Sequence, residues 1–514
     1  MRPIRWLGLG VVTLIVLIAC SSLPALDDRS DSFAYPVSVT QSTAIGQSIA
    51  DEVAAHPQQS GILTLPQAQD AFAARLLLAS AAERSLDVQY YIWRNDKTGQ
   101  LLMQSLYDAA QRGVRVRLLI DDLNSGPIED KLVALNQHAS IEVRLFNPFA
   151  IRGPRSLGFI TDFARANRRM HNKSFTADNQ VTIIGGRNVG DDYFSGADGV
   201  LFADLDALAI GEVVTDVSTD FDGFWNSQSA YPLELLTSPV SSAQKASTIA
   251  TLFENEEAAT LFMQSIQDRE LFNQMLDGEV PLEWAQTRMV SDDPRKALGT
   301  VDEDQLLTYA LRDIMGKPEA SIYLVSPYFV PTLTGVETLE EMAARGVEIH
   351  ILTNSFAATD VAIVHSGYAK WRQRLLQSGI RIYEMRPSVV EPDNGNPDIP
   401  RFASSASSLH AKTFAIDGER VFIGSFNFDP RSAALNTELG FVIESETLAQ
   451  QTADIFASEV PFNAYELRLA PSGRMYWLER NPGHHQRHDT EPDSTLLQRA
   501  SVRFFSWLPI DWLL

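Results

Sequence analysis

The chain has a single cysteine, Cys20, among its 514 residues, which excludes an intramolecular disulfide and any disulfide-stabilised scaffold. Basic residues are also scarce: 42 lysines and arginines stand against 65 aspartates and glutamates, for a net charge of −23. Because nucleic-acid binding depends on basic side chains that neutralise phosphates, this balance argues against a nucleic-acid partner. Hydrophobic residues make up 45% of the chain, enough to bury sizeable cores.

The N-terminal apolar stretch, Trp6–Ala19, is shorter than the about 20 residues that a membrane-spanning helix needs. It follows Arg2 and Arg5 and ends in Leu17-Ile18-Ala19-Cys20, which resembles the lipobox of bacterial lipoproteins. We therefore predict a lipoprotein signal peptide over 1–20, lipid attachment at Cys20, and a location on a bacterial envelope membrane, facing the periplasm. The alternative is an uncleaved N-terminal anchor, which would also tether the chain to a membrane.

One short pattern occurs twice in the same register. His171-Asn172-Lys173 precedes Asp178, and His410-Ala411-Lys412 precedes Asp417 at the same spacing. Both copies are followed at matching distances by a glycine and an asparagine, namely Gly185 and Asn188, then Gly424 and Asn427. A pattern repeated in register to this extent predicts two copies of one half-site.

The segments around the two motifs repeat as well, since Arg112–Val116 recurs as Arg345–Ile349. Each of these expected strands follows a helix-like segment and an earlier strand, Leu86–Trp93 or Ser321–Val330. Strand, helix and strand in this order indicate a parallel α/β crossover in each half. The sequence thus predicts a pseudo-twofold pair of duplicated α/β domains.

The expected boundaries follow from these repeats and from changes in composition. We predict a linker over 21–62, a first domain over 63–226, an inter-domain segment over 227–300, a second domain over 301–470, and a polar linker with an aromatic tail over 471–514.

The C-terminal region leaves two questions open. His484, His485 and His488 lie within the polar stretch Arg474–Thr495, which we interpret as a solvated linker in preference to a metal site. The last residues, Phe504–Leu514, either dock into the fold or lie in a membrane interface, because tryptophan side chains favour the lipid headgroup level.

The residue types in the repeated motif favour phosphate chemistry. An ammonium and an asparagine amide can hold phosphate oxygens, while an imidazole attacks phosphorus or protonates a leaving oxygen. Two half-sites facing each other would let one histidine form a phosphohistidine and the other act as general acid and then base. Asp417 lies at an Asp-Gly turn, where we expect a structural role. Nothing in the motif requires a metal or another cofactor.

The doubled HxKx4D motif with its downstream Gly and Asn resembles the phospholipase D superfamily. Four further segments are similar to bacterial cardiolipin synthases of the C type: Leu86–Trp93, Gly185–Asp191, Ser326–Pro331 and Gly424–Ser432. The resemblance extends from Leu63 to the C-terminus. It implies two phospholipase D-like α/β/α domains with one active site between them, and metal-independent transfer of a phosphatidyl group through a phosphohistidine.

The resemblance also implies roles for individual residues. The catalytic set would be His171, Lys173, Asp178, His410, Lys412 and Asp417, supported at the phosphate or the imidazoles by Asn188, Asn427, Ser425, Asp206 and Glu438. An acidic residue is expected to hold each imidazole by its far nitrogen: Glu438 for His410, and Asp206 for His171. By the same analogy, we favour His171 as the nucleophile and His410 as the acid.

Two smaller features remain open at this point. Ser425 has no hydroxyl counterpart in the first half, because Gly186 occupies the matching position, and this asymmetry could separate the roles of the two histidines. Arg165, Arg168 and Arg169 either meet the phosphate of a second lipid or form a solvated helix face.

The expected function is a membrane-anchored phosphatidyltransferase that makes cardiolipin from phosphatidylglycerol and a second phospholipid, either phosphatidylethanolamine or phosphatidylglycerol. Two alternatives stay open. One is a phospholipase D that hydrolyses phospholipids to phosphatidic acid with the same residues, and the other is a non-catalytic envelope lipoprotein. Phospholipids are the expected partners, and the sequence does not decide whether an accessory protein is required.

Overall fold

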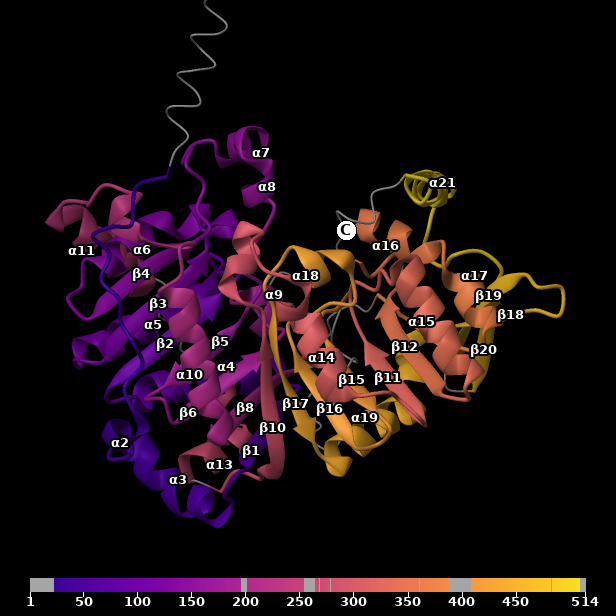
Figure 1. Ribbon diagram of the computed structural model, residues 1–514, viewed down its shortest axis with the longest axis horizontal. Helices are drawn as coiled ribbons and strands as arrows, with labels where there is room; N and C mark the ends of the chain where they lie inside the picture. The colour runs from indigo at the N-terminus through magenta and orange to yellow at the C-terminus, as the bar shows by residue number, and fades with distance from the viewer. Residues whose placement is uncertain are drawn as a thin grey trace, which may run out of the picture.

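The computed structural model describes residues 23–195, 201–253, 264–267, 269–277, 279–359, 361–387, 408–481 and 483–508. The predicted signal peptide and Cys20 lie outside these ranges. Two lobes lie side by side, one built mainly from residues before β10 (Glu283–Ser291) and one from residues after it (Figure 1). Within the described ranges, no helix is both long and apolar enough to cross a bilayer.

The first lobe contains three central parallel strands flanked by antiparallel ones. Its strand order is β9 (Ala230–Pro232), β4 (Ile141–Phe146), β3 (Arg115–Asp121), β2 (Ser85–Tyr90), β5 (Ser174–Ala177), β6 (Val181–Gly185), β8 (Asp206–Gly211) and β1 (Ser60–Leu65). The parallel strands β2, β3 and β4 are connected by α5 (Lys97–Gln111) and α6 (Glu129–Asn136), which are the crossover helices that the sequence predicts.

The second lobe repeats this arrangement. Its strand order is β17 (Leu439–Glu444), β16 (Arg420–Gly424), β15 (Thr413–Ile416), β11 (Ser321–Val325), β12 (Glu348–Asn354), β13 (Arg381–Met385), β18 (Ala464–Leu469), β19 (Met475–Asn481) and β20 (His484–His488). Helix α15 (Thr332–Ala344) connects β11 to β12. The series β4-β3-β2-β5-β6-β8 thus has its counterpart in β13-β12-β11-β15-β16-β17, as expected for a duplication.

Strand β10 joins the two lobes into one sheet. Its first residues, Glu283–Ala285, pair antiparallel with Ser60–Ile62 of β1, and Gln286–Ser291 pair antiparallel with β17. Strand β1 lies on β8, and β10 lies at the matching position on β17, so the pseudo-twofold relation passes between them. Hydrogen bonding along this sheet fixes how the two halves face each other.

Helices cover both faces of the sheet in each lobe, because successive strand residues point to opposite sides. In β3, Leu118 packs in the core beneath α4 (Ala68–Ala81) and α5, whereas Leu119 packs with Trp225 of α10 (Glu212–Trp225). In β11, Leu324 packs with α14 (Leu307–Met315) and α15, whereas Val325 packs on the side of α19 (Glu446–Ser458). The predicted α/β/α architecture of each domain is confirmed.

The segment predicted as an N-terminal linker is folded against the first lobe, so that prediction is wrong. It contains α2 (Val37–Thr40) and α3 (Ala44–Ala55), and β1 begins within it. Before these helices, the Arg29 guanidinium donates to the carbonyl of Ala230 at 3.1 Å, and the backbone N–H of Ala34 donates to Asp222 at 2.9 Å. These contacts are made across the chain, so local sequence gives no sign of them.

The C-terminal polar stretch is also not a linker. Strands β19 and β20 form an antiparallel hairpin on β18, and Trp477 is buried in the core of the second lobe. His488 Nε2 lies 2.8 Å from Glu479, and the described residues contain no group of three side chains able to hold a metal ion. Edge strands with polar side chains on their open face lack the apolar pattern that identifies a strand, which explains the wrong interpretation.

Asp178 and Asp417 each stabilise their own lobe through equivalent contacts. The Asp178 carboxylate accepts from the backbone N–H groups of Glu83, Arg84 and Ser85, at the start of β2. Asp417 does the same at the start of β11, with Glu319, Ala320 and Ser321. Both lie at the ends of β5 and β15 that point away from the histidines. Neither carboxylate therefore lies beside the histidines, in contrast to the predicted catalytic set, and the contacts of Asp417 agree with the structural role expected for it.

Replacing Asp178 by alanine should lower the free energy of unfolding by about 3 kcal/mol or more, because three backbone donors lose a charged acceptor. Urea unfolding measures the change. Asp417→Ala, at a more exposed position, should cost less. An Asp178→Ala protein with unchanged stability and no turnover would instead mean that this carboxylate acts in the chemistry.

Candidate active site

The two motif histidines come together where the lobes meet, each beside a short backbone pairing between lobes. Met170 forms a parallel bridge with Thr437, and the backbone N–H of His171 donates to the Thr437 carbonyl at 2.9 Å. On the other side, β14 (Ser408–Leu409) pairs in parallel with β7 (Phe202–Ala203), and the His410 N–H donates to the Ala203 carbonyl at 2.7 Å. The duplicated site is thus assembled by main-chain hydrogen bonds as well as by packing.

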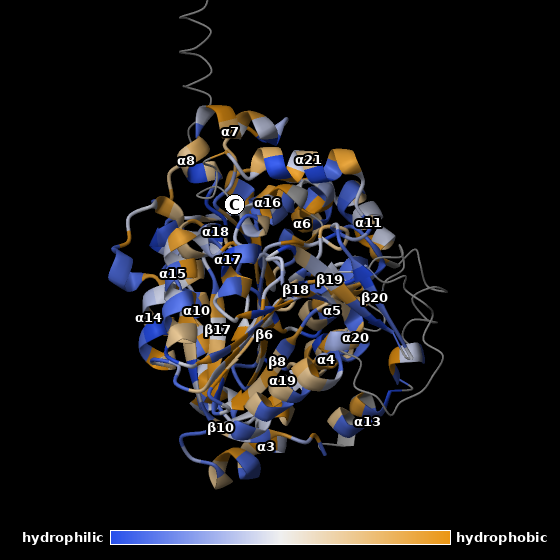
Figure 2. Cartoon of the chain, turned by 90° about the vertical axis from the view of Figure 1, so that its right-hand side faces the viewer, coloured by the Kyte–Doolittle hydropathy of each residue, from blue (hydrophilic) through white to orange (hydrophobic). Residues whose placement is uncertain are grey.

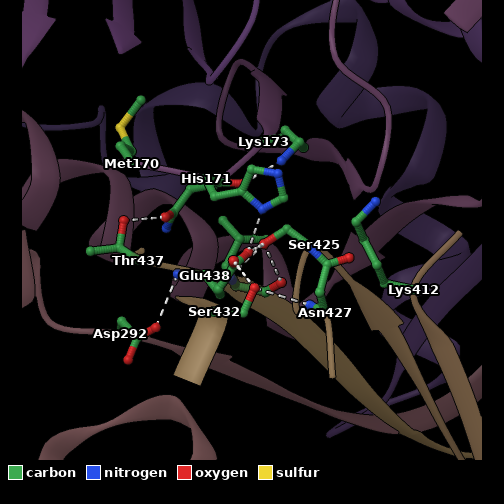
Figure 3. Close-up of polar contacts among 12 residues, drawn as sticks. Met170, His171, Lys173, Asp292, Lys412, Ser425, Asn427, Ser432, Thr437 and Glu438 are labelled. Carbon is green, nitrogen blue, oxygen red and sulfur yellow. Dashed lines mark hydrogen bonds and ion pairs between the residues drawn. The ribbon is translucent and has the colours of Figure 1, made fainter. Parts of the chain in front are cut away.

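Each histidine takes its acidic partner from the opposite lobe. His171 Nδ1 lies 2.8 Å from a carboxylate oxygen of Glu438, and His410 Nδ1 lies 2.5 Å from one of Asp204 (Figure 3 shows the first pair). The predicted pairs, Glu438 with His410 and Asp206 with His171, are therefore wrong. Since a carboxylate only accepts, each Nδ1 carries the proton and each Nε2 is left for chemistry.

The crossing follows from strand register. In a parallel pairing, the residues that follow two partners are also neighbours. Leu409 is paired with Ala203, so His410 comes beside Asp204, and Met170 is paired with Thr437, so His171 comes beside Glu438. The sequence shows both acidic residues, but only the pairing between lobes decides which histidine each one holds.

Asp206 has a different task, although it lies two residues beyond Asp204. Its carboxylate accepts from the Arg75 guanidinium at 2.8 Å and from the backbone N–H of Arg187 at 3.2 Å. Arg75 also donates to the Tyr90 hydroxyl at 2.8 Å. All of these side chains are buried, so Asp206 supports the first lobe and makes no contact with a motif histidine.

Glu438 is held by more groups than His171 alone. The hydroxyls of Ser425 and Ser432 donate to its carboxylate at 2.5 and 2.8 Å, and its backbone N–H donates to Asp292 at 3.0 Å (Figure 3). Burial raises the pKa of Glu438, while the charge of Lys173 and these two hydroxyls lower it. Ser425 thus positions the partner of His171, which is more specific than the supporting role predicted for it.

Gly186 occupies the position in the first half that matches Ser425 in the second, and the structure requires a glycine there. A Cβ atom added at Gly186 would lie 2.1 Å from the Asp204 carboxylate oxygen, so no side chain fits there. In one half-site, the Ser425 hydroxyl donates to the carboxylate of Glu438. In the other, the absence of a side chain at Gly186 leaves room for the carboxylate of Asp204.

The two motif lysines are buried together with the histidines. Burial, together with the charge of Lys412, lowers the pKa of Lys173 to about 7, against the raising effect of Glu438. Burial and the charges of Lys173, Lys412 and His410 hold the pKa of His171 well below its usual range. Burial and Lys412 also lower the pKa of His410, although Asp204 raises it. Both imidazoles are therefore neutral at neutral pH in the free protein, and the lysines are placed to receive an anion.

The two asparagines are not equivalent. The Asn188 side chain accepts from the Ile92 N–H at 3.1 Å and donates to the Tyr193 hydroxyl at 3.0 Å. Asn427 keeps a buried amide oxygen that meets no hydrogen-bond donor in the described parts of the chain. Asn188 is thus committed to the protein, and Asn427 is the better placed of the two to contact a ligand.

Aromatic rings flank both histidines, and sequence reasoning missed their role. Tyr91 packs edge-on against His171 with ring centroids 5.1 Å apart, and Tyr193 packs edge-on against His410 at 5.3 Å. Burial, followed by the charge of Asp121, raises the pKa of Tyr91 to about 12, so it stays a neutral phenol. Tyr91 lies in the repeated strand segment Leu86–Trp93, which was the one available signal for it.

The arginines before His171 are engaged by the protein. Arg165 pairs with Asp162, Arg168 donates to the carbonyls of Lys296 and Ala434 at 3.1 and 3.0 Å, and the fully buried Arg169 pairs with Asp121. These contacts favour a structural role over the alternative of a second phosphate site.

A family described as cardiolipin synthase, PLD-like domain matches residues 76–225 and 311–460, one copy in each lobe. The chain belongs to this family. It is 49% identical to cardiolipin synthase C of Escherichia coli (strain K12) over 460 residues, which are 89% of this chain and 97% of that protein. It is also 32% identical to an uncharacterized protein of Helicobacter pylori (strain ATCC 700392 / 26695) over 91% of this chain and 92% of that one.

A solved structure, the phosphatidylserine synthase of Haemophilus influenzae Rd KW20, has the same fold. It superposes with a TM-score of 0.53 over 91% of this chain and all of that one, at 13% sequence identity. The expectation of a cardiolipin synthase-like phosphatidyltransferase of the phospholipase D superfamily is confirmed at the level of the family.

Glu438→Gln should lower turnover by at least about 10²-fold, because a neutral amide no longer stabilises a cationic His171, while the serine contacts can persist. Asp204→Asn should do the same through His410. As a matched control, Asp206→Asn should mainly reduce stability, by about 3–5 kcal/mol, because it leaves the buried Arg75 without a charged partner. Turnover per folded protein and urea unfolding distinguish the two effects. A catalytic defect in Asp206→Asn with full stability would contradict this assignment.

Anion binding should weaken as pH rises above 7. The Lys173 ammonium is present below its pKa of about 7 and is lost above it, so an anion that binds the charged form gains affinity at the lower pH. We expect roughly tenfold weaker binding of tungstate at pH 8.5 than at pH 6.5, measured by calorimetry. In Lys173→Arg, which stays charged throughout, this dependence should become much weaker. Equal pH dependence in both proteins would show that another group titrates.

Proposed function

We propose that this protein makes cardiolipin by transferring a phosphatidyl group to phosphatidylglycerol through a phosphohistidine, at a bacterial membrane. The observation that carries the proposal is the pair of buried imidazoles, each with Nδ1 on a carboxylate and both lying among two lysines. This arrangement leaves one nitrogen per ring for a two-step displacement at phosphorus. The family membership supports cardiolipin as the product.

In the first step, neutral His171 attacks the phosphorus of the donor lipid through Nε2. The new N–P bond forms as the bond to the headgroup oxygen breaks, and His410 gives that oxygen its proton. Glu438 stabilises the positive charge that the imidazole gains, at the 2.8 Å contact with Nδ1. Because the pKa of free His410 is lowered, its protonation depends on the bound phosphate, whose negative charge favours the cationic ring.

In the second step, a hydroxyl of phosphatidylglycerol replaces the headgroup alcohol. His410, now neutral, accepts its proton through Nε2, the hydroxyl oxygen attacks phosphorus, and the N–P bond breaks. The lysine ammonium groups stabilise the phosphoryl oxygens in both transition states, and their burial strengthens this effect. The donor is phosphatidylethanolamine or a second phosphatidylglycerol, since the headgroup of each, ethanolamine or glycerol, leaves as a small alcohol.

Membrane attachment is the second part of the proposal. Lipid modification of Cys20 would hold the active site beside its substrates, facing the periplasm, despite the net charge of −23. Replacing Cys20 by alanine should release the protein from the membrane fraction, and full retention of this variant would contradict the lipid anchor.

Product analysis tests the reaction. The full chain, reconstituted in vesicles of phosphatidylglycerol and phosphatidylethanolamine, should form cardiolipin that is absent with His171→Ala, as resolved by mass spectrometry. Isotope labelling of one lipid then identifies the donor. Phosphatidic acid without cardiolipin would mean hydrolysis, and no turnover of either kind would favour a non-catalytic lipoprotein.

Trapping tests the intermediate. With a donor whose leaving group departs without protonation, such as phosphatidyl-p-nitrophenol, His410→Ala should still form an acid-labile phosphatidyl adduct on His171. It should then accumulate this adduct, because the general base of the second step is missing. The double variant His171→Ala, His410→Ala serves as the control without adduct. An adduct on His410 in His171→Ala, and none in His410→Ala, would reverse the two roles.

A further inference from the structure

Helix α21 (Leu496–Phe505) presents an apolar face away from the protein. Leu496, Leu497 and Phe504 are 77%, 79% and 59% exposed, and Trp507, just beyond the helix, is 77% exposed. At about 100° per residue, Leu496, Leu497 and Phe504 lie within one arc of the helix. Val502, on the other side, is buried. A helix that turns its larger apolar residues outward has a face that the rest of the described chain does not cover.

This exposure is not that of a loose chain end, because α21 is fixed at its start. The Thr495 side chain and Gln498 form a capping box, and Arg499 donates to the Ser494 hydroxyl at 3.1 Å. Just before the helix, the Glu491 carboxylate accepts from Arg372 at 2.7 Å and lies 2.8 Å from His365 Nε2 on α16 (Ala362–Ala369). Buried ion pairs thus hold the chain in place just before the helix.

A second exposed apolar cluster lies on the other lobe. Leu157, Ile160 and Phe163 are 38%, 80% and 43% exposed. They lie in a short helical region made of a 3-10 turn (Arg155–Leu157), α7 (Gly158–Thr161) and α8 (Phe163–Ala166). Arg165 fixes this region by donating to the Pro148 carbonyl at 2.8 Å. The chain passes from α8 almost directly into His171, so this cluster belongs to the segment that carries the proposed nucleophile.

The two clusters lie on the same side of the molecule. In Figure 1, α7 and α8 rise above the first lobe and α21 above the second, with α18 (Pro430–Ala434) lower and between them. Figure 2, turned by 90°, again places α7 and α21 at the upper end, where both carry hydrophobic residues. Helix α18 begins close after Asn427, so the active-site segments lie beneath this side of the protein.

Charge distinguishes α21 from the rest of the chain. Thr495–Leu508 contains Arg499 and Arg503 and no acidic residue, in a protein of net charge −23. Arg503 is exposed beside the apolar face. Apolar and aromatic side chains with flanking arginines fit the interface of an anionic phospholipid bilayer, which accepts the rings at headgroup level and attracts the guanidinium groups.

We infer that α7–α8 and α21 form a docking surface that seats the two lobes on a phospholipid bilayer, directly over the active site. The inference rests on the proposed function, because a lipid substrate gives such a surface its use. Leu157, Ile160 and Phe163 enter the bilayer interface on one side, and Leu496, Leu497, Phe504 and Trp507 enter on the other. A phospholipid then reaches the histidines without its chains crossing water.

A local fluorescence probe tests the surface independently of activity. Three full-length proteins carry Cys20→Ser and one new thiol labelled with an environment-sensitive nitrobenzoxadiazole: Leu497→Cys, Ile160→Cys, or Val39→Cys as control. Val39 is similarly exposed apolar surface, at 44%, on α2 at the lower end of Figure 1. Vesicles of phosphatidylglycerol and phosphatidylethanolamine should shift emission at 160 and 497 to the blue, with quenching by spin-labelled lipid, and leave position 39 unchanged.

The opposite results overturn the inference. No response at 160 and 497, or an equal response at 39, would exclude this face as the docking surface. A blue shift that follows protein concentration without vesicles would assign the face to a second copy of the chain.

Activity gives a second readout. The variant L496S/L497S/F504S/W507S should make cardiolipin at least about tenfold more slowly on vesicles, while its rate in detergent mixed micelles stays within about twofold of the parent, because micelles supply substrate without docking. An equal loss in both would overturn the inference. If the parent makes no cardiolipin, the proposed function fails, and the probe alone decides the docking surface.

Discussion

The pairing of each imidazole with a carboxylate of the opposite lobe is the interaction on which the site depends. His171 is oriented by Glu438 and His410 by Asp204, so neither lobe holds a complete half-site. The pairs are buried, where a carboxylate with no partner would be costly. The continuous sheet through β10 and the two short pairings between lobes keep both contacts in register. Duplication supplied the motifs, and the contact between lobes makes them one site.

The two half-sites share this arrangement but differ in the groups around each histidine. Ser425 donates to Glu438, whereas Gly186 leaves room for Asp204. Asn188 is bonded on both sides of its amide, whereas Asn427 keeps a buried oxygen with no donor in the described chain. Such differences break the pseudo-twofold symmetry at the reacting groups, which suits a mechanism that needs one nucleophile and one acid.

The active site contains buried lysines although the chain as a whole is acidic. An excess of acidic residues gives the protein a net charge of −23, yet Lys173 and Lys412 are buried beside the histidines. Their burial is unfavourable in the free protein, which is why the pKa of Lys173 falls to about 7. A phosphate bound there would recover part of this cost, and the site therefore favours anions in spite of the charge around it.

Much of the fold and of the active site could be predicted from the sequence. The repeated HxKx4D motif identifies the histidines and lysines, the repeated strand segments predict two α/β domains, and the Asp-Gly turn indicates the structural role of Asp417. These signals are local, because strand periodicity, turn chemistry and motif spacing act between residues near in the chain. The docked segment around Arg29 and the hairpin of β19 and β20 escaped prediction, since both depend on distant partners.

What only the tertiary structure decided is which groups meet across the lobes. Sequence placed Asp206 and Glu438 each with the histidine of its own half, and Asp204 received no role. Strand register between lobes instead gives Glu438 to His171 and Asp204 to His410, and leaves Asp206 to Arg75. Sequence determines the chemistry a residue can perform, whereas a partner hundreds of residues away is set by how hydrogen-bonded backbones align in space.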